Sequence, residues 1–275
     1  MKTVRFYLVR HGQTYSNLRK MMIGGGGSAP LTPRGRQAAK HLGLELLDTP
    51  FVAAYASPLA RAVETARLAL GGRDMPVVHV EGLRDVFWGD MEGGIPADIV
   101  AMKKERPDDP YFPLGNLDTP EYRSPFNGET ICAFVERFEK ALTAIAKEHQ
   151  ETGGDILAVS HAGLGSFLAV KGGPHLHEKM DTVNISRMPE VDNTSVSIVE
   201  WNDGVFTVKS VNDLSPIRKG EAIAAAKNPL EITLFSDVET LFSRKRLLEG
   251  CCDSMLTEEG KKRARKLRAQ YAATP

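Results

Sequence analysis

The sequence predicts an α/β protein of three layers, in which helices cover both faces of a mainly parallel central sheet. Two apolar runs, at residues 4–9 and 156–160, have the composition of buried parallel strands. Between them, residues 129–148 carry apolar side chains at the helical period of 3.6 residues. Strands that alternate with helices favour a parallel sheet, because each helix returns the chain to the end of the sheet where the next strand begins.

The first 80 residues contain the elements of this fold in order. A strand over residues 3–9 precedes a helix that begins near Thr32-Pro33 and runs to about Leu47, because threonine caps a helix and proline suits its first turn. A strand, a helix and a short strand then follow, at residues 52–57, 59–70 and 77–80.

Residues 93–128 interrupt the alternation. Prolines and glycines are frequent there, and we interpret this stretch as an irregular cap insertion. After the strand at 156–160, a helix is expected to begin near Gly163. Two final strands, at residues 195–201 and 205–211, flank Asn202-Asp203-Gly204, which is a strong hairpin signal.

Composition narrows the class of protein. The chain has 275 residues, of which 42% are hydrophobic and 25% charged, and its formal net charge is zero, as in an ordinary globular protein. That balance argues against a nucleic-acid or membrane-surface partner held by bulk charge. Three cysteines, Cys132, Cys251 and Cys252, are too few for a disulfide framework or a zinc site. Without a signal peptide or a long apolar segment, we expect a cytoplasmic location.

Chemistry-bearing residues follow two of the predicted strands. Arg10-His11-Gly12 ends the first strand, and Ser160-His161 ends the strand at 156–160. If the two strands are neighbours, both histidines lie at the carboxyl edge of the sheet, where open α/β sheets bind ligands. Arg61, in the first turn of a helix, would project towards the same edge. A neutral imidazole can attack phosphorus, and guanidinium groups hold phosphate oxygens bidentately.

These motifs and their order resemble the histidine phosphatase superfamily, in the branch of the cofactor-dependent phosphoglycerate mutases and their phosphatase relatives. The resemblance covers roughly residues 3–211 and implies a phosphoglycerate mutase-like fold. The matching motifs are Arg10-His11-Gly12-Gln13-Thr14 with Asn17, Leu31-Thr32 with Gly35 and Gln37-Ala38, Ser57-Pro58 with Arg61 and Thr65-Ala66, Asn127-Gly128-Glu129-Thr130, Ser160-His161-Ala162-Gly163, and Asp192-Asn193-Thr194-Ser195-Val196.

The resemblance implies that His11 is the nucleophile and forms a phosphohistidine. Arg10, Arg61 and His161 would hold the phosphoryl oxygens with help from Asn17, because phosphoryl transfer needs positioning and neutralisation of charge. We expect His11 to be neutral, so that it can attack, and His161 to act as a charged or hydrogen-bond-donating imidazole. No metal ion or other cofactor is expected.

The acid that protonates the leaving oxygen is a departure from the family. The family usually has a glutamate in a Leu-x-Glu segment, whereas this chain reads Leu83-Arg84-Asp85. Asp85 is one methylene shorter, and its pKa must rise for it to be protonated near neutral pH. Glu92 or a bound water is the alternative acid. Otherwise we interpret Asp90 and Glu92 as carboxylates that lie on the surface or brace a loop.

Other candidates have structural interpretations. Isolated histidines, His41, His79 and His149, fit structural or solvated positions. His175 and His177 lack acidic or thiol partners at a spacing that would complete a metal site. No Lys-Ser/Thr follows the glycines at 24–27, which excludes a P-loop and favours a mobile loop beside the substrate entrance.

The carboxyl-terminal segment resembles the amino-terminal segment in sequence. Residues 232–240 align with residues 6–14 at an offset of 226, and 256–260 align with 31–35 at an offset of 225. Either a degenerate partial repeat or coincidence explains this, and we favour the repeat, in which Asp237 replaces the nucleophile. A lone strand must pair with the sheet of its own chain or of a second copy, which would form a homodimer. The basic helix at 258–271 is a solvated face or a docking surface for an acidic partner.

We therefore expect a histidine phosphatase domain at 1–215 and an extension at 216–275 that partly repeats residues 6–47. The predicted activity is metal-independent hydrolysis of a small phosphorylated metabolite through phosphohistidine. Two alternatives remain open: phosphoglycerate mutase-type transfer, and a phosphate-ligand sensor or interaction protein that works through its extension.

Overall fold

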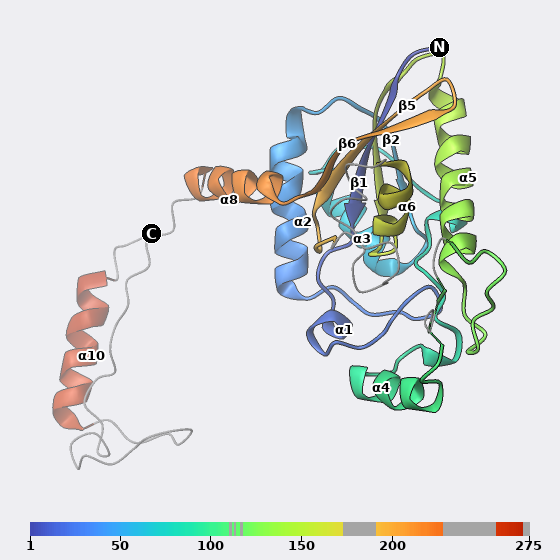
Figure 1. The fold of residues 1–275 in the computed structure, drawn as a ribbon. Helices are drawn as coiled ribbons and strands as arrows, with labels where there is room; N and C mark the ends of the chain where they lie inside the picture. The colour runs from blue at the N-terminus through green and yellow to red at the C-terminus, as the bar shows by residue number, and fades with distance from the viewer. Residues whose placement is uncertain (110–111, 113, 116–117, 173–190, 228–256, 272–275) are drawn as a thin grey trace. The chain divides into compact units, whose positions relative to one another are not determined.

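The computed structural model describes the whole chain except residues 110–111, 113, 116–117, 173–190, 228–256 and 272–275. It divides into two compact units, Met1–Asn228 and Pro229–Pro275, each described by itself. Figure 1 shows the elements of both units.

The first unit is built on a six-stranded sheet. Its strands are β1 Val4–Arg10, β2 Phe51–Ala56, β3 Val77–His79, β4 Gly154–Ser160, β5 Val196–Asn202 and β6 Val205–Asp213. Their order is β3-β2-β4-β1-β5-β6; the first four are parallel, while β5 and β6 are antiparallel to their neighbours. Between β5 and β6, Asp203 and Gly204 have φ angles of 47° and 83°, as a type I′ hairpin turn requires. The predicted mainly parallel sheet with a terminal hairpin is confirmed.

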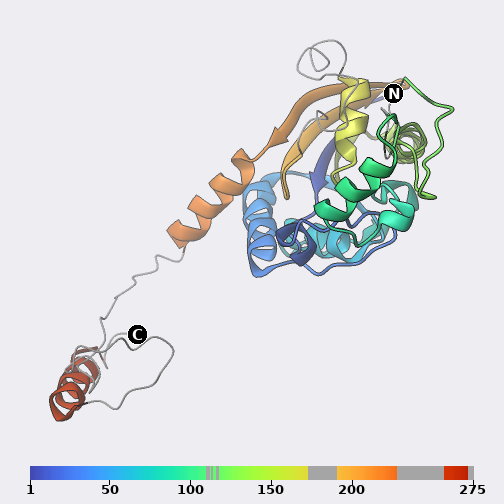
Figure 2. The same cartoon turned by 60° about the horizontal axis from the view of Figure 1, so that its bottom comes forward.

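Helices cover both faces of the sheet. The α-helices of the first unit are α1 Tyr15–Leu18, α2 Pro33–Glu45, α3 Ala60–Ala69, α4 Pro96–Glu105, α5 Ile131–His149, α6 Leu164–Lys171 and α8 Ser215–Lys227. Short 3₁₀ turns lie at Leu46–Asp48, Glu81–Leu83 and Gly89–Met91. Figures 1 and 2 show α2 on one side of the sheet and α5 on the other, so the three predicted layers are present.

Strand alternation explains the layers. Successive side chains of a strand point to opposite faces. Phe6 and Leu8 of β1 belong to a core with apolar residues of α5 and α6. Val9 belongs to a second core, with α2 and α3. Each face of β1 therefore holds one layer of helices, and the strand end that carries His11 is fixed between two packed cores.

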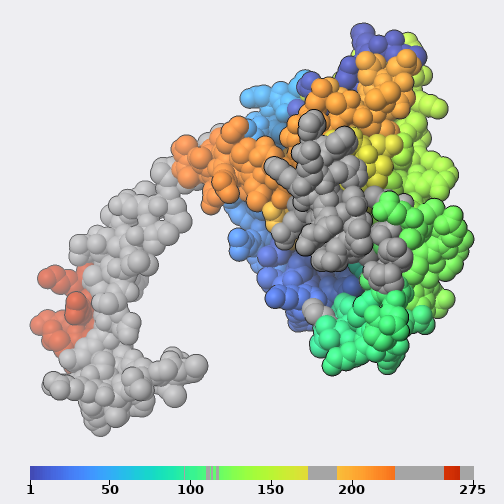
Figure 3. Space-filling view, viewed as in Figure 1, coloured from blue at the N-terminus to red at the C-terminus, as the bar shows by residue number. Residues whose placement is uncertain are grey.

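The predicted insertion at 93–128 is not wholly irregular. Helix α4 begins at Pro96, which suits a first helical turn, and its described neighbours are turns. In Figure 3 the green atoms of α4 lie at the lower edge of the face shown. Among the described residues, no helix is both long and apolar enough to cross a bilayer.

Helix α8 packs against α2 and belongs to the first unit. A Cβ atom added to Gly220 would lie 1.7 Å from the carbonyl oxygen of His41, so only glycine permits this approach. An ion pair of 3.4 Å between Lys219 and Glu45 also links the two helices.

In the second unit, α10 spans Glu258–Tyr271. Thr257 caps it, because its Oγ1 accepts from Gly260 N at 3.0 Å, as Thr32 Oγ1 accepts from Gly35 N at 3.0 Å. The strand expected near residues 232–240 lies outside the described residues. The repeat, the homodimer and the division at 215 therefore stay predictions.

Candidate active site

His11 lies directly after β1, and its ring has a defined tautomer. The backbone N–H of His11 donates to Ser160 O at 2.9 Å, which joins the ends of β1 and β4. Its Nδ1 lies 2.8 Å from the carbonyl oxygen of Gly12. A carbonyl can only accept, so Nδ1 carries the proton and the neutral ring has its lone pair on Nε2. Burial lowers the pKa of His11 well below its usual range, and Arg61 and Arg10 lower it further.

Gly12 must be glycine for this arrangement. A Cβ there would lie 2.7 Å from Gly35 O, at the start of α2. Its N–H donates to Thr65 Oγ1 of α3 at 2.9 Å. The turn that presents His11 is thus held between two helices.

His161 follows β4 and faces His11, with 5.1 Å between the ring centroids. Its Nδ1 accepts from Nε of Arg61 at 3.2 Å, and its Nε2 lies 2.7 Å from Ser57 Oγ. Burial lowers the pKa of His161 well below its usual range, and the nearby charges add to the effect. From the sequence, we expected His161 to be a charged or hydrogen-bond-donating imidazole. The lowered pKa disfavours the charged form, and the one N–H of the neutral ring, on Nε2, points at Ser57 Oγ.

Arg61, on the first turn of α3, is buried beside both histidines. Its Nη1 and Nη2 donate to the carbonyl oxygens of Gly27 and Gly24, at 3.0 and 2.9 Å. The predicted phosphate-holding arginine therefore also holds the glycine-rich loop. Arg61 itself does not line the cavity described below, but its neighbour His11 does.

Asp85 lies against the same cluster. Its Oδ2 is 3.6 Å from Nη2 of Arg61 and 3.8 Å from Nδ1 of His161, and its Oδ1 accepts from Val86 N at 3.0 Å. Burial raises the pKa of Asp85 to about 6, and the Arg61 cation opposes that rise. A carboxyl group with this pKa is protonated in part of the molecules near neutral pH, as an acid catalyst requires.

Glu92, the alternative acid, has another role. Its carboxylate accepts from the backbone N–H groups of Gly24, Gly26 and Trp88 at 2.9, 3.1 and 3.3 Å. It braces the glycine-rich loop, as the sequence suggested, and it does not line the cavity.

Arg10 and Asn17 line the cavity beside His11. Asn17 Oδ1 accepts from Thr14 N at 3.0 Å and from Nδ2 of Asn193 at 3.3 Å. Because this oxygen is engaged, the amide Nδ2 of Asn17 is the group suited to a ligand. Nδ2 of Asn193 also donates to His11 O at 2.9 Å. Asn193 lies in a quoted motif, but sequence reasoning gave it no role.

The cavity has a volume of about 340 Å³ and two kinds of wall. Arg10, His11, Asn17 and Asp85 form the polar wall. The other wall is apolar and includes Met21, Met22, Ile23, Val86, Trp88, Leu114, Ile131 and Val191. The two methionines therefore face the site. Among the described residues, Arg10 is the one cation that lines it.

Arg137 and Glu129 hold the loop that carries Asp85, and sequence reasoning missed this clamp. Nε and Nη2 of Arg137 donate to the two carboxylate oxygens of Glu129, both at 2.7 Å. The guanidinium also donates to the carbonyl oxygens of residues 82, 84 and 85, each at 2.9 Å. Glu129 belongs to a quoted motif, but no local pattern links it to a backbone segment 45 residues earlier.

The family model described as histidine phosphatase superfamily (branch 1) matches residues 6–214. This match spans most of the chain, including both histidines and their neighbours. The chain therefore belongs to the histidine phosphatase superfamily.

Similar individual proteins include one named as a phosphatase and one named as a mutase. The adenosylcobalamin/alpha-ribazole phosphatase of Escherichia coli is 32% identical over 169 residues, which cover 61% of this chain and 78% of that protein. YhfR of Bacillus stearothermophilus is 32% identical with a TM-score of 0.65, covering 78% of this chain and 99% of that one. Phosphoglycerate mutase of Bacillus anthracis is 26% identical with a TM-score of 0.66, covering 80% and 97%.

Proposed function

We propose that this protein is a metal-independent phosphomonoesterase that hydrolyses a small phosphorylated metabolite through a phosphohistidine on His11. The tautomer of His11 carries the proposal. Because Nδ1–H is bound by Gly12 O, the lone pair of Nε2 is available to attack phosphorus without prior loss of a proton.

In the first step, Nε2 of His11 attacks the phosphorus and the ester P–O bond breaks. Asp85, in its protonated form, gives its proton to the leaving oxygen, so an alcohol departs. Arg10 and Asn17, which line the cavity, stabilise the oxygens of the transferring group. Arg61 and His161 are buried beside His11, and the Arg61 cation adds positive charge near the phosphoryl group. The His11–Gly12 hydrogen bond supports the imidazolium that the N–P bond creates.

In the second step, water attacks the phosphohistidine and the N–P bond breaks. The Asp85 carboxylate accepts a proton from the water, which restores both the acid and the neutral imidazole, and phosphate leaves. The relatives named as phosphatases support hydrolysis.

The walls of the cavity support a narrower substrate class: a phosphate monoester whose alcohol is largely apolar. Among the described lining residues, the single cation suits one phosphate group, and the apolar wall has no charged partner for a second.

The test compares wild-type protein with His11→Ala on p-nitrophenyl phosphate and on alkyl phosphates. We expect His11→Ala to lose at least about a thousandfold in kcat. Rapid acid-free quenching of the wild-type reaction with radiolabelled substrate should trap label on His11. Unchanged turnover in His11→Ala refutes the enzymatic proposal. Transfer of label to an added alcohol acceptor in preference to water would instead identify a mutase.

A further inference from the structure

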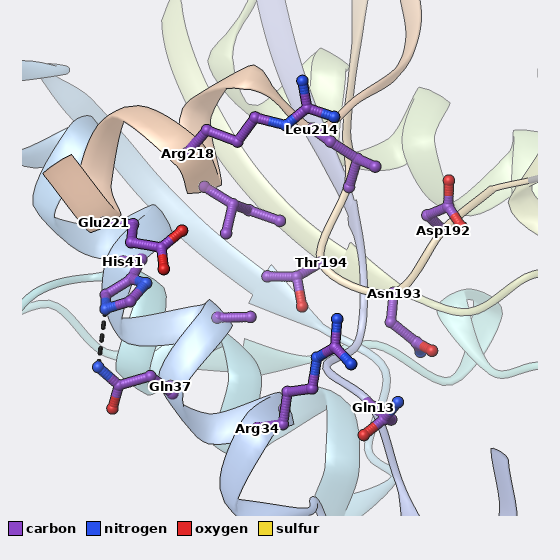
Figure 4. Close-up of a pocket in the computed structure, with 13 residues that line it drawn as sticks. Gln13, Arg34, Gln37, His41, Asp192, Asn193, Thr194, Leu214, Arg218 and Glu221 are labelled. Carbon is purple, nitrogen blue, oxygen red and sulfur yellow. Dashed lines mark hydrogen bonds between the residues drawn. The ribbon is translucent and has the colours of Figure 1, made fainter. Parts of the chain in front are cut away.

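A second cavity lies between helices α2 and α8. Its volume is about 530 Å³, and it shares no lining residue with the catalytic cavity. Its walls come from α2, from α8 and from the segment Asp192–Thr194 that links towards β5. Figure 4 shows these side chains around the cavity.

One wall lies outside the segment that the family model matches. The family model ends at residue 214, and α8 begins at Ser215. Ile217, Arg218 and Glu221 of α8 line the cavity. The close approach of Gly220 to α2 anchors this helix, so this wall is packed against the rest of the first unit.

The polar chemistry of the cavity favours an anion. Arg34 of α2 and Arg218 of α8 lie on opposite sides of it in Figure 4, with Thr194 between them. Among the described residues, neither guanidinium has a hydrogen bond or an ion pair. The Asp192 carboxylate is already engaged, because its Oδ2 accepts from Nδ2 of Asn212 at 3.1 Å. Glu221, the other carboxylate that lines the cavity, can accept a hydrogen bond from a hydroxyl or amino group of a ligand.

The segment on the third wall contacts the catalytic strand directly. Thr194 N donates to Arg10 O at 2.8 Å, and the Asn193 side chain donates to His11 O at 2.9 Å. Thr194 is buried and has a φ of 66°, which is a strained conformation for a β-branched residue. A ligand that moved or fixed this segment would act on the backbone that positions both Arg10 and His11.

We propose that this α2–α8 cavity is a second ligand site, which binds a small anion with a hydroxyl or amino group. Arg34 and Arg218 bind its carboxylate or phosphate-type group together, and Glu221 binds the hydrogen-bond donor. Residues Asp192–Thr194 couple its occupancy to the catalytic site.

The test uses two probes, one for each class of anionic group that the cavity could bind. Citrate supplies carboxylates with a hydroxyl, and hydroxymethylphosphonate supplies a phosphate-like group that cannot be hydrolysed. Each is titrated calorimetrically into wild-type protein, Arg34→Ala and Arg218→Ala. The matched controls are Arg36→Ala, whose side chain pairs with Glu64, and Lys219→Ala, whose side chain pairs with Glu45; neither lines the cavity.

We expect at least one probe to bind the wild-type protein and both controls. Its affinity should fall about tenfold or more in each of the two cavity variants, because each loses a charge-assisted hydrogen bond. Since neither arginine lines the catalytic cavity, such a loss assigns the binding to the second site. All four variants should keep the wild-type kcat and KM for p-nitrophenyl phosphate when no probe is present.

Coupling is measured with orthovanadate, a phosphate mimic for the catalytic site. Saturating probe should change the vanadate affinity, and saturating vanadate should change the probe affinity by the same factor. Failure of both probes to bind below about 10 mM, or equal affinity in all five proteins, overturns the site. Loss in one cavity variant alone overturns the paired binding, and an unchanged vanadate affinity overturns the coupling. The binding and coupling measurements require no turnover, so the site and the proposed hydrolysis can fail separately.

Discussion

Replacing Arg137 by alanine should strongly destabilise the loop that carries Asp85. The guanidinium bridges Glu129 and three carbonyl oxygens of residues 82–85. The Glu129 side chain is 15% exposed. Removal of the cation therefore leaves a largely buried carboxylate and three carbonyl groups without their donor.

The magnitude follows from burial. Removing one partner of a buried ion pair costs about 3–5 kcal/mol of unfolding free energy. The Arg137 side chain is 29% exposed, so water can replace part of what is lost, and we expect the lower end, about 3 kcal/mol. Urea unfolding of Arg137→Ala measures the loss. Lys140→Ala is the control on the same helix, because its pair with Glu136 is exposed, at 74% and 68%, and should change stability by less than about 0.5 kcal/mol.

Catalysis by Arg137→Ala should depend on the leaving group. An alkoxide needs a proton to depart, whereas p-nitrophenolate is a good leaving group without one. If the clamp positions Asp85, kcat/KM for an alkyl phosphate should fall at least about tenfold further than that for p-nitrophenyl phosphate. Glu129→Gln should show the same pattern more weakly. Equal losses on both substrates, or a destabilisation below about 1 kcal/mol, would contradict this reasoning.

Four further predictions concern Asp85 and two close backbone contacts. In the proposed mechanism only protonated Asp85 can act as the acid, so kcat/KM for an alkyl phosphate should fall as pH rises through about 6, and Asp85→Asn should not show this fall. Because the pKa of Asp85 is raised from 3.8 to about 6 in the folded protein, the free energy of unfolding should fall by up to about 3 kcal/mol as pH rises through this range. Thermal melts should therefore find Asp85→Asn more stable than wild type at pH 8 but not at pH 4. Gly12→Ala should lower stability by about 1–3 kcal/mol in urea unfolding and reduce kcat, since its Cβ would meet Gly35 O at 2.7 Å; normal kcat would contradict the close packing. Gly220→Ala should displace α8 from α2, detectable as faster hydrogen exchange in α8, and unaltered exchange would contradict this contact.

The parts of the fold that the sequence predicted well are those specified by local pattern. Continuous apolar runs marked β1 and β4, and Thr32-Pro33 marked the start of α2, because these signals need only neighbouring residues. The meeting of His11 and His161 followed from one further inference, that strands with polar residues at their ends lie side by side.

The parts that the sequence did not predict depend on distant partners. Whether Arg137 faces solvent or clamps residues 82–85 is decided by tertiary packing, since a single arginine on an amphipathic helix usually lies on the solvated face. The neutral state of His161 likewise depends on burial and on Arg61, which α3 brings to it. Helix α8 carries no motif, and its contact with α2 depends on the missing side chain of Gly220.

The departure at Asp85 is consistent with the way its surroundings are built. An aspartate reaches less far than a glutamate, so the position of its carboxyl group depends more on the backbone. That backbone is fixed, because Arg137 binds the carbonyl groups on three of its residues. Burial then raises the pKa of Asp85 even though the Arg61 cation lies 3.6 Å away, so desolvation outweighs the opposing charge. The buried Asp85 side chain, on a backbone fixed by Arg137, can thus keep its proton close to the bound phosphate group. Loosening this loop should therefore impair proton transfer more than phosphate binding.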